Sequence, residues 1–141
     1  MNAKEYLSQG YRLEKMIRLQ MREIEELREL CTGISSPGFT ERYSASKSTD
    51  APFEKVLLRA EEMERKLAGS LDQYLAFKQE IMEVFDKIED RDQRIVLHYR
   101  YLCNWTWNRI GDELNWDERT IRRIHNKALE HVEVPDNPVI I

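Results

Sequence analysis

A mainly apolar series of positions in the first 31 residues recurs at alternating intervals of four and three. The series consists of Tyr6, Gly10, Leu13, Ile17, Gln20, Ile24, Leu27 and Cys31. This spacing is the heptad seam of a coiled coil, and it predicts an amphipathic helix over residues 1–31. Six basic and six acidic side chains share the same segment. Charges of both signs in this pattern indicate a solvated helix face.

A second apolar seam predicts a long helix over residues 53–88. Its members are Leu57, Ala60, Leu67, Leu71, Tyr74, Ile81, Phe85 and Ile88. The segment between the two helices, residues 32–52, is rich in Ser, Gly and Pro and is expected to be a linker. Neither helix can bury its seam alone. The two helices therefore either fold back as an antiparallel hairpin or pair between subunits in a homodimer.

Two short amphipathic helices with a tight turn between them are expected over residues 106–132. Thr106 is suited to cap the first of these helices, and Asp117 to cap the second. Asn115 interrupts the apolar pattern, and asparagine tolerates the left-handed backbone conformation of tight turns. This order of elements is that of a helix-turn-helix, whose second helix enters the major groove of DNA.

An additional helix is expected to complete a domain over residues 90–132. Asp90 and Gln93 have the spacing of a capping box at its start. Its expected apolar face consists of Ile95, Val96, Tyr99 and Leu102. Trp107 and Trp116 are expected in the small core, and Trp105 is expected to be exposed. The prolines at 135 and 138 end the helical pattern, so residues 133–141 are expected to form a non-helical tail.

The last helix is basic in a chain whose formal net charge is −4. Its apolar residues are Ile121, Ile124, Ala128 and Leu129. Between residues 119 and 127 the chain has four basic side chains and no carboxylate. A local basic surface of this kind favours a polyanionic partner, and here it predicts double-stranded DNA.

Residues 90–132 resemble region 4 of the bacterial sigma-70 factors, a module that reads a promoter element. The resemblance rests on the helix DRDQRIVLHYRYL, on Thr106 followed by an apolar residue and Ile110, on the turn, and on TIRRIHNKAL. Asn115 stands where that family usually has glycine. The resemblance implies a DNA-binding transcription regulator. The residues expected to contact DNA are Thr106, Glu118, Arg119, Thr120, Arg122, Arg123, Asn126 and Lys127.

The whole chain is also similar to sigma-region-4-like proteins of phages and prophages of Gram-positive bacteria. These are related to the ArpU and RinA types of late-gene transcription regulator. The similarity covers the opening MNAKEYL, the RLEKMI helix, the Ser-rich linker and the helix-turn-helix. It implies an accessory regulator, with RNA polymerase as a further partner and the long helices used for assembly.

The sequence offers no arrangement of residues typical of an enzyme. It has no HExxH, no paired cysteines and no glycine-rich phosphate loop, so we expect no catalysis, no cofactor and no metal. A charged fraction of 34% with five glycines and four prolines favours an all-α fold. Without a long apolar run or a signal peptide, the protein is expected to be cytoplasmic and not to enter a membrane.

Two other functions stay open at this point. Small terminase subunits also join a helix-turn-helix to helical oligomerisation segments, so the chain is alternatively a DNA-packaging adaptor. It is otherwise a helical protein–protein interaction module whose helix-turn-helix never meets DNA. A ring of eight or more subunits would indicate the first alternative, and absence of duplex binding would indicate the second.

Overall fold

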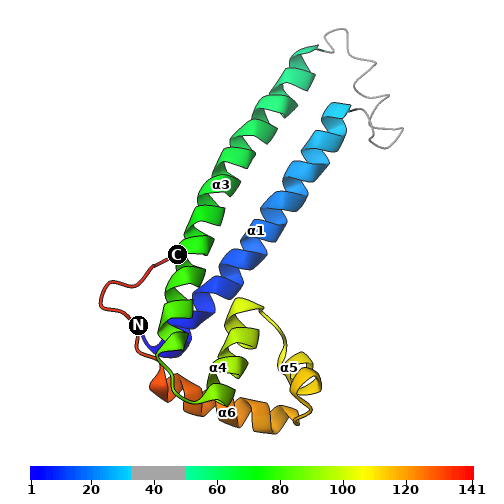
Figure 1. The fold of residues 1–141 in the computed structure, drawn as a ribbon. Coiled ribbons are helices and arrows are strands. Elements are labelled where there is room, and N and C mark those ends of the chain that lie inside the picture. The colour runs from blue at the N-terminus through cyan, green and yellow to red at the C-terminus, as the bar shows by residue number, and fades with distance from the viewer. Residues whose placement is uncertain (33–49) are drawn as a thin grey trace. The chain divides into compact units, whose positions relative to one another are not determined.

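All regular elements in the described part of the chain are helices, which confirms the predicted all-α fold (Figure 1). The computed structural model describes residues 1–32 and 50–141, so most of the expected linker lies outside the described residues. The elements are α1 (Ala3–Thr32), α3 (Asp50–Asp86), α4 (Arg91–Leu97), the π-helix η1 (His98–Leu102), α5 (Trp107–Leu114) and α6 (Glu118–His131). Within this part, no helix is both long and apolar enough to cross a bilayer.

The chain forms two compact units. Unit 1 comprises residues 1–14 and 72–141, and unit 2 comprises residues 15–71. The first turns of α1 and the last turns of α3 therefore belong to the same unit as α4, α5 and α6. The sequence patterns predicted different divisions, which kept the long helices apart from the helix-turn-helix domain.

Unit 2 contains the later part of α1 and the earlier part of α3. Ile17, Ile24 and Ala60 are buried there. Arg28 pairs with Glu64 at 2.8 Å, with 40% and 43% of the two side chains exposed. An ion pair as exposed as this one stabilises the fold by at most about 1 kcal/mol, so the apolar seam contributes most of the packing.

In unit 1 the first turns of α1 pack antiparallel against the last turns of α3 (Figure 1). The ring of Tyr6 meets Phe77 edge-on, with centroids 5.7 Å apart. The Tyr6 hydroxyl donates a hydrogen bond to Glu80. Gly10 leaves room for the same phenylalanine, because a Cβ atom there would lie 2.6 Å from its Cε1 atom.

The predicted seam of α3 is incomplete in unit 1. Phe77 and Val84 are buried although the heptad pattern did not include them. Leu71, the last residue of unit 2, was included in the pattern but is 38% exposed. Residues of α1, η1 and α6 all pack on this part of α3. A helix that packs against several other helices buries a wider part of its surface than the heptad pattern of a two-helix coiled coil predicts.

Two apolar clusters fill unit 1, and the continuous helix of α4 and η1 lies between them. Val96 packs with Ile110 and Ile121 on one side. Leu97 and Tyr101 belong to the other cluster, whose further members are Tyr6, Leu7, Phe77, Ile81, Val84, Phe85, Ile88, Ala128 and Val132. This helix therefore has two buried faces, whereas its sequence pattern predicted one.

The capping box at Asp90 is only half formed. The Asp90 carboxylate accepts a hydrogen bond from the backbone N–H of Gln93 at 3.0 Å, as expected. The Gln93 side chain does not return to Asp90. Its Oε1 atom lies 2.7 Å from Nδ1 of His131 at the end of α6. Gln93 thus joins two helices, because a buried amide is satisfied by the nearest available partner.

The tail after α6 is non-helical and lies against unit 1. The backbone N–H of Val139 donates to the Glu80 carboxylate at 3.1 Å. Gln9 of α1 accepts from the N–H of Ile141 at 3.1 Å and donates to the carbonyl of Val139 at 3.2 Å. These bonds satisfy backbone groups that a chain leaving a helix would otherwise expose to water.

Candidate nucleic-acid interface

The turn between α5 and α6 has the backbone conformation predicted from Asn115. This residue has φ 57° and ψ 39°, in the left-handed region. The Gly111 carbonyl accepts from the N–H of Asn115 and from the N–H of Trp116 at 3.0 Å. A left-handed residue with these two bonds is a common way to end a helix abruptly. The turn redirects the chain into α6 within three residues.

Gly111 is a second requirement of the turn, and the sequence pattern did not identify it. A Cβ atom on this residue would lie 2.7 Å from the backbone oxygen of Trp116. Backbone atoms of a tight turn cannot move away cheaply, so α5 needs glycine at this position.

Both helices of the pair are capped by the residues predicted to do so. Thr106 Oγ1 accepts from the N–H of Arg109 at 3.2 Å, and Asp117 Oδ1 accepts from the N–H of Thr120 at 2.8 Å. The hydrogen bonds to Thr120, with smaller effects of Arg119 and Arg123, lower the pKa of the Asp117 carboxyl. The carboxylate therefore stays ionised at the positive end of α6.

The inner face of α6 contains the predicted apolar residues. Ile121 and Ala128 are fully buried, and Ile124 and Leu129 are partly buried against the two clusters. His125 shares this face and is 4% exposed. Its Nε2 atom lies 2.6 Å from the Tyr101 hydroxyl. His125 therefore holds α6 against η1.

Burial also sets the protonation state of His125. The pKa of this imidazole is lowered to about 4, chiefly by desolvation and also by the nearby Arg100 and Lys4, against a hydrogen bond with Asn126 that raises it. The ring is neutral at pH 7. It packs edge-on against Trp107, with centroids 4.6 Å apart.

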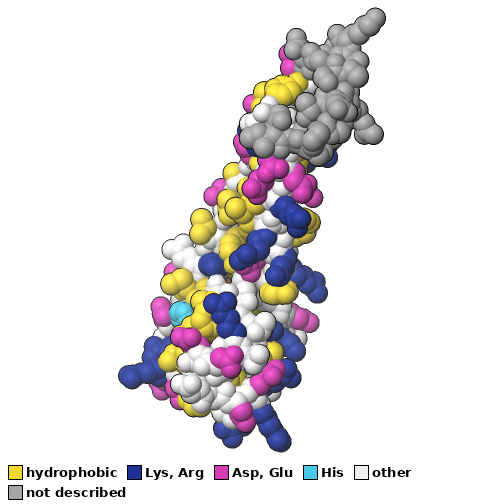
Figure 2. Space-filling view, turned by 90° about the vertical axis from the view of Figure 1, so that its right-hand side faces the viewer, with side chains coloured by type: hydrophobic (Ala, Val, Ile, Leu, Met, Phe, Trp, Pro, Cys, Tyr) yellow, Lys and Arg dark blue, Asp and Glu magenta, His cyan; other side chains and the backbone are white. Residues whose placement is uncertain are grey.

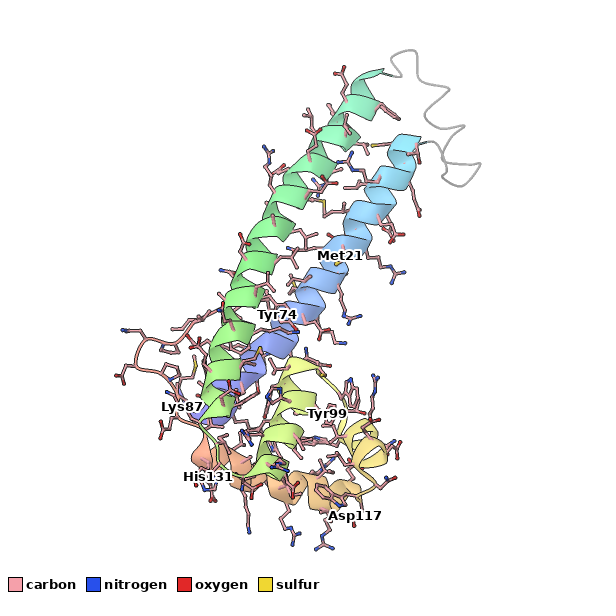
Figure 3. The ribbon with its side chains drawn as sticks, viewed as in Figure 1. Met21, Tyr74, Lys87, Tyr99, Asp117 and His131 are labelled. Carbon is pink, nitrogen blue, oxygen red and sulfur yellow. The ribbon has the colours of Figure 1, made fainter. Side chains whose placement is uncertain are left out.

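The outer face of α6 carries the residues that were predicted to contact DNA. Figure 3 shows this helix running from the capping residue Asp117 to His131. Thr120 is partly buried, and Thr106 is exposed at the start of α5. The exposed side chains of α6 in the predicted set are Glu118, Arg119, Arg122, Arg123, Asn126 and Lys127.

The basic residues of this face are not equivalent. Arg122 Nη2 lies 2.7 Å from Glu118 Oε1, an i, i+4 ion pair. Arg119 and Arg123 have no ion pair with an acidic side chain within the described residues. Both lie on the side of the helix opposite Ile121, by the 3.6-residue period of an α-helix. Their charges therefore point toward solvent.

Two of the three tryptophans differ from the sequence prediction. Trp116 is 37% exposed, because its carbonyl, rather than its ring, faces Gly111 in the turn. Trp105 is partly buried instead of exposed: it stacks on Tyr99 at 4.4 Å. The predictions for these two residues were wrong. Trp107, which is partly buried, packs against the small cluster as expected.

Arginines cover the rings of two of these tryptophans. The Arg109 guanidinium lies 4.0 Å from the centre of the Trp105 ring. The Arg100 guanidinium lies 4.1 Å from the centre of the Trp107 ring. The Nη1 atom of Arg100 also donates a hydrogen bond to the carbonyl of Trp105 at 2.9 Å. Arginine over an aromatic face is favourable, and here it fixes the loop before α5.

The two flanks of α6 differ in charge. A hollow of about 230 Å³ beside Arg123 and Lys127 is lined by Asp90 and Asp92. The opposite flank borders a cleft of about 430 Å³ that is lined by four basic side chains and no acidic one. On the face drawn in Figure 2, basic side chains in dark blue lie among acidic ones in magenta. A cleft whose charged lining residues are all basic therefore stands out from a mixed surface.

The comparison with known families identifies the helix-turn-helix segment. Residues 86–133 match the family Sigma-70, region 4. The match covers about a third of the chain and contains α4, η1, α5 and α6. It bears out a helix-turn-helix of the sigma-region-4 type. No curated protein and no solved structure matches the chain.

Proposed function

We propose that the protein is a transcription regulator that binds duplex DNA with α6 in the major groove. The observation that carries this proposal is the outer face of α6, where exposed basic side chains follow a tight turn. The similarity of residues 86–133 to sigma-70 region 4 supports it. A capped helix presented in this way offers its N-terminal residues to base edges.

The side chains of α6 divide into base-reading and phosphate-binding groups. Arg119 and Arg123 are suited to bind guanine, and Asn126 to bind adenine, through paired hydrogen bonds. Glu118 is suited to accept from a cytosine amino group while it orients Arg122. Thr106, Thr120 and Lys127 lie at positions suited to phosphate contacts, which fix the register without reading sequence. A matched arginine–guanine pair contributes about 1–3 kcal/mol of discrimination.

A single α6 is a weak anchor for DNA at physiological salt. Affinity from phosphate contacts falls steeply as salt rises, and α6 supplies only a few basic side chains. We therefore propose that a second subunit or RNA polymerase provides further contacts. Met16, Leu19 and Leu58 in unit 2 are at least half exposed and favour a homodimer through the long helices. The relation to phage late-gene regulators belongs to the same proposal and rests on the sequence resemblance.

Binding to random duplex DNA, followed by selection and sequencing of the bound fraction, tests the proposal. We expect a defined short motif for the natural sequence. The variant Arg119→Ala/Arg123→Ala should lose that motif and bind the selected duplex at least tenfold more weakly, since both base contacts are removed.

A control variant separates base reading from net charge. Lys87→Ala/Arg91→Ala removes two exposed basic side chains from the same unit, and Lys87 lies well away from Asp117 at the start of α6 (Figure 3). It should keep the motif. An unchanged affinity and salt dependence in the α6 variant would contradict the proposal. Rings of eight or more subunits would favour a packaging adaptor, and no duplex binding would favour an interaction module.

A further inference from the structure

The basic cleft beside α6 is built partly from α1, which lies outside the segment that matches sigma-70 region 4. Its cavity of about 430 Å³ is bordered by the first three turns of α1, by η1, by the start of α5 and by α6. All of these lining residues belong to unit 1. The basic side chains are Lys4, Arg12, Arg100 and Arg122.

The two basic residues of α1 in this cleft, Lys4 and Arg12, make no ion pair that would stabilise the described part of the fold. Lys4 and Arg12 are exposed, and neither has an ion pair with an acidic side chain in the described part of the chain. They are eight residues apart with Ser8 between them, which places all three on one face of α1. The four basic side chains around one cleft repel each other, so an anionic ligand would stabilise this arrangement.

The other two basic residues are already positioned by their neighbours. Arg100 is fixed by the Trp105 carbonyl and by the ring of Trp107, and Arg122 by Glu118. Positioned donors lose little freedom on binding an anion, which favours a specific contact over a diffuse one. Lys4 and Arg100 both lower the pKa of His125 at the floor of the cleft. The positive electrostatic potentials of Lys4 and Arg100 therefore overlap within the cleft.

We propose that this cleft takes a phosphate group of the DNA backbone next to the groove that α6 reads, so that α1 is part of the DNA interface. The proposal rests on the proposed function. Arg122 and Asn126 line the cleft and also belong to the predicted DNA-contacting face of α6. Trp107, which follows the expected phosphate-binding residue Thr106, lines it as well. With α6 in the major groove, the sugar-phosphate backbone at the edge of that groove would pass the side of α6 that borders the cleft.

The variant Lys4→Ala/Arg12→Ala tests the cleft in the full chain. Affinity is measured by fluorescence anisotropy of a labelled duplex over a series of KCl concentrations. We expect binding to weaken about five- to tenfold near physiological salt, and the slope of log affinity against log salt to fall in magnitude by about one to two. The preferred sequence should not change, because phosphate contacts carry no sequence information.

A matched control removes the same charges from unit 2. Arg22→Ala/Lys66→Ala replaces two exposed residues that pair only with Glu26 and Glu62 on their own helices. Circular dichroism should show the same helix content for all variants. If the control weakens binding as much as the cleft variant does, the effect is one of net charge and the cleft proposal is overturned.

The remaining outcomes separate the cleft from the proposed function. If Lys4→Ala/Arg12→Ala binds duplex like the natural sequence while Arg119→Ala/Arg123→Ala does not, the cleft proposal fails and the proposed function stands. If no duplex is bound at all, both fail. Calorimetry with tripolyphosphate adds one arm: binding that is lost in the cleft variant, with DNA affinity unchanged, would assign the cleft to a free polyphosphate and overturn the proposal.

Discussion

The hydroxyl oxygen of Tyr101 lies 2.6 Å from Nε2 of His125 and joins η1 to α6 across the floor of the basic cleft. Burial raises the pKa of Tyr101 to about 12 and lowers that of His125 to about 4. At neutral pH the tyrosine is therefore protonated and donates to an uncharged imidazole. The orientation of α6 depends on this bond, and acid should break it.

The stability of unit 1 is expected to fall as the pH drops from about 6.5 to 4. The His125 pKa is about 6.5 in the unfolded chain and about 4 in the folded one. The unfolded state therefore binds more protons in this range, and the stabilisation present above pH 6.5 is lost as the pH falls. We expect a loss of about 2 kcal/mol, measured as the shift in urea unfolding at pH 7, 5.5 and 4.5.

A variant at the same position provides the control for this pH dependence. His125→Gln should be less stable at pH 7 but should have a flatter profile between pH 6.5 and 4. Some slope should remain, because burial also lowers the pKa of His98. A profile as steep as that of the natural sequence would show that another group is responsible.

Gly111→Ala is expected to disrupt the turn of the helix-turn-helix. The new Cβ atom would lie 2.7 Å from the backbone oxygen of Trp116, so α5 and α6 would have to move apart. Overpacking of this kind costs about 1–3 kcal/mol, which exceeds the gain in helix propensity. Gly69→Ala is the matched control, since nothing lies within 4 Å of a Cβ atom there. It should stabilise α3 by about 0.5–1 kcal/mol.

The comparison is made by thermal unfolding of both glycine variants and by their affinity for duplex DNA. Gly111→Ala should unfold at a lower temperature and bind more weakly, and Gly69→Ala should unfold at a higher temperature with unchanged affinity. Equal stability of the two variants would contradict a backbone clash at the turn.

The features that were predicted correctly depend on short stretches of sequence. Asn115, Thr106 and Asp117 each act on backbone groups within a few residues, and the preference of each residue type for that task is a local property. The alternation of apolar and polar positions likewise identified the inner face of α6. These features could be predicted without knowing which helices pack together.

The features that were missed depend on contacts between distant segments. Phe77 is buried because helices from both ends of the chain cover α3. Gln93 turns from its own cap to His131, 38 residues away. The cleft needs α1 beside α6, and no periodicity within either helix contains that information. Trp105 is partly buried because Asn104 adopts φ 55° and η1 ends in a π turn.

Asn115→Gly is expected to leave the fold intact, and Asn115→Val is expected to destabilise it. The left-handed conformation at φ 57° is open to glycine but unfavourable for a β-branched residue by about 1–2 kcal/mol. Urea unfolding at pH 7 measures both. The substitutions change the stability of the turn and leave the DNA-contacting side chains in place. The DNA affinity of each variant at low temperature should therefore be proportional to its folded fraction. A valine variant as stable as the natural protein would argue against a left-handed residue at this turn.

Glu118→Gln is expected to strengthen non-specific DNA binding with little effect on stability. The Glu118–Arg122 pair has side chains 48% and 58% exposed, so it contributes at most about 1 kcal/mol to the fold. The change would remove a negative charge from the DNA-facing end of α6, next to Arg122. We expect severalfold tighter binding to random duplex and a steeper salt dependence.

The selected DNA motif distinguishes two roles of this carboxylate. If Glu118 accepts a hydrogen bond from cytosine, Glu118→Gln should also bind less selectively, because one base pair would lose about 1–3 kcal/mol of discrimination. If it only orients Arg122, the motif should persist. Glu89→Gln, an exposed change of the same charge ahead of α4, is the control. Equal tightening by both variants would mean that Glu118 acts through net charge alone.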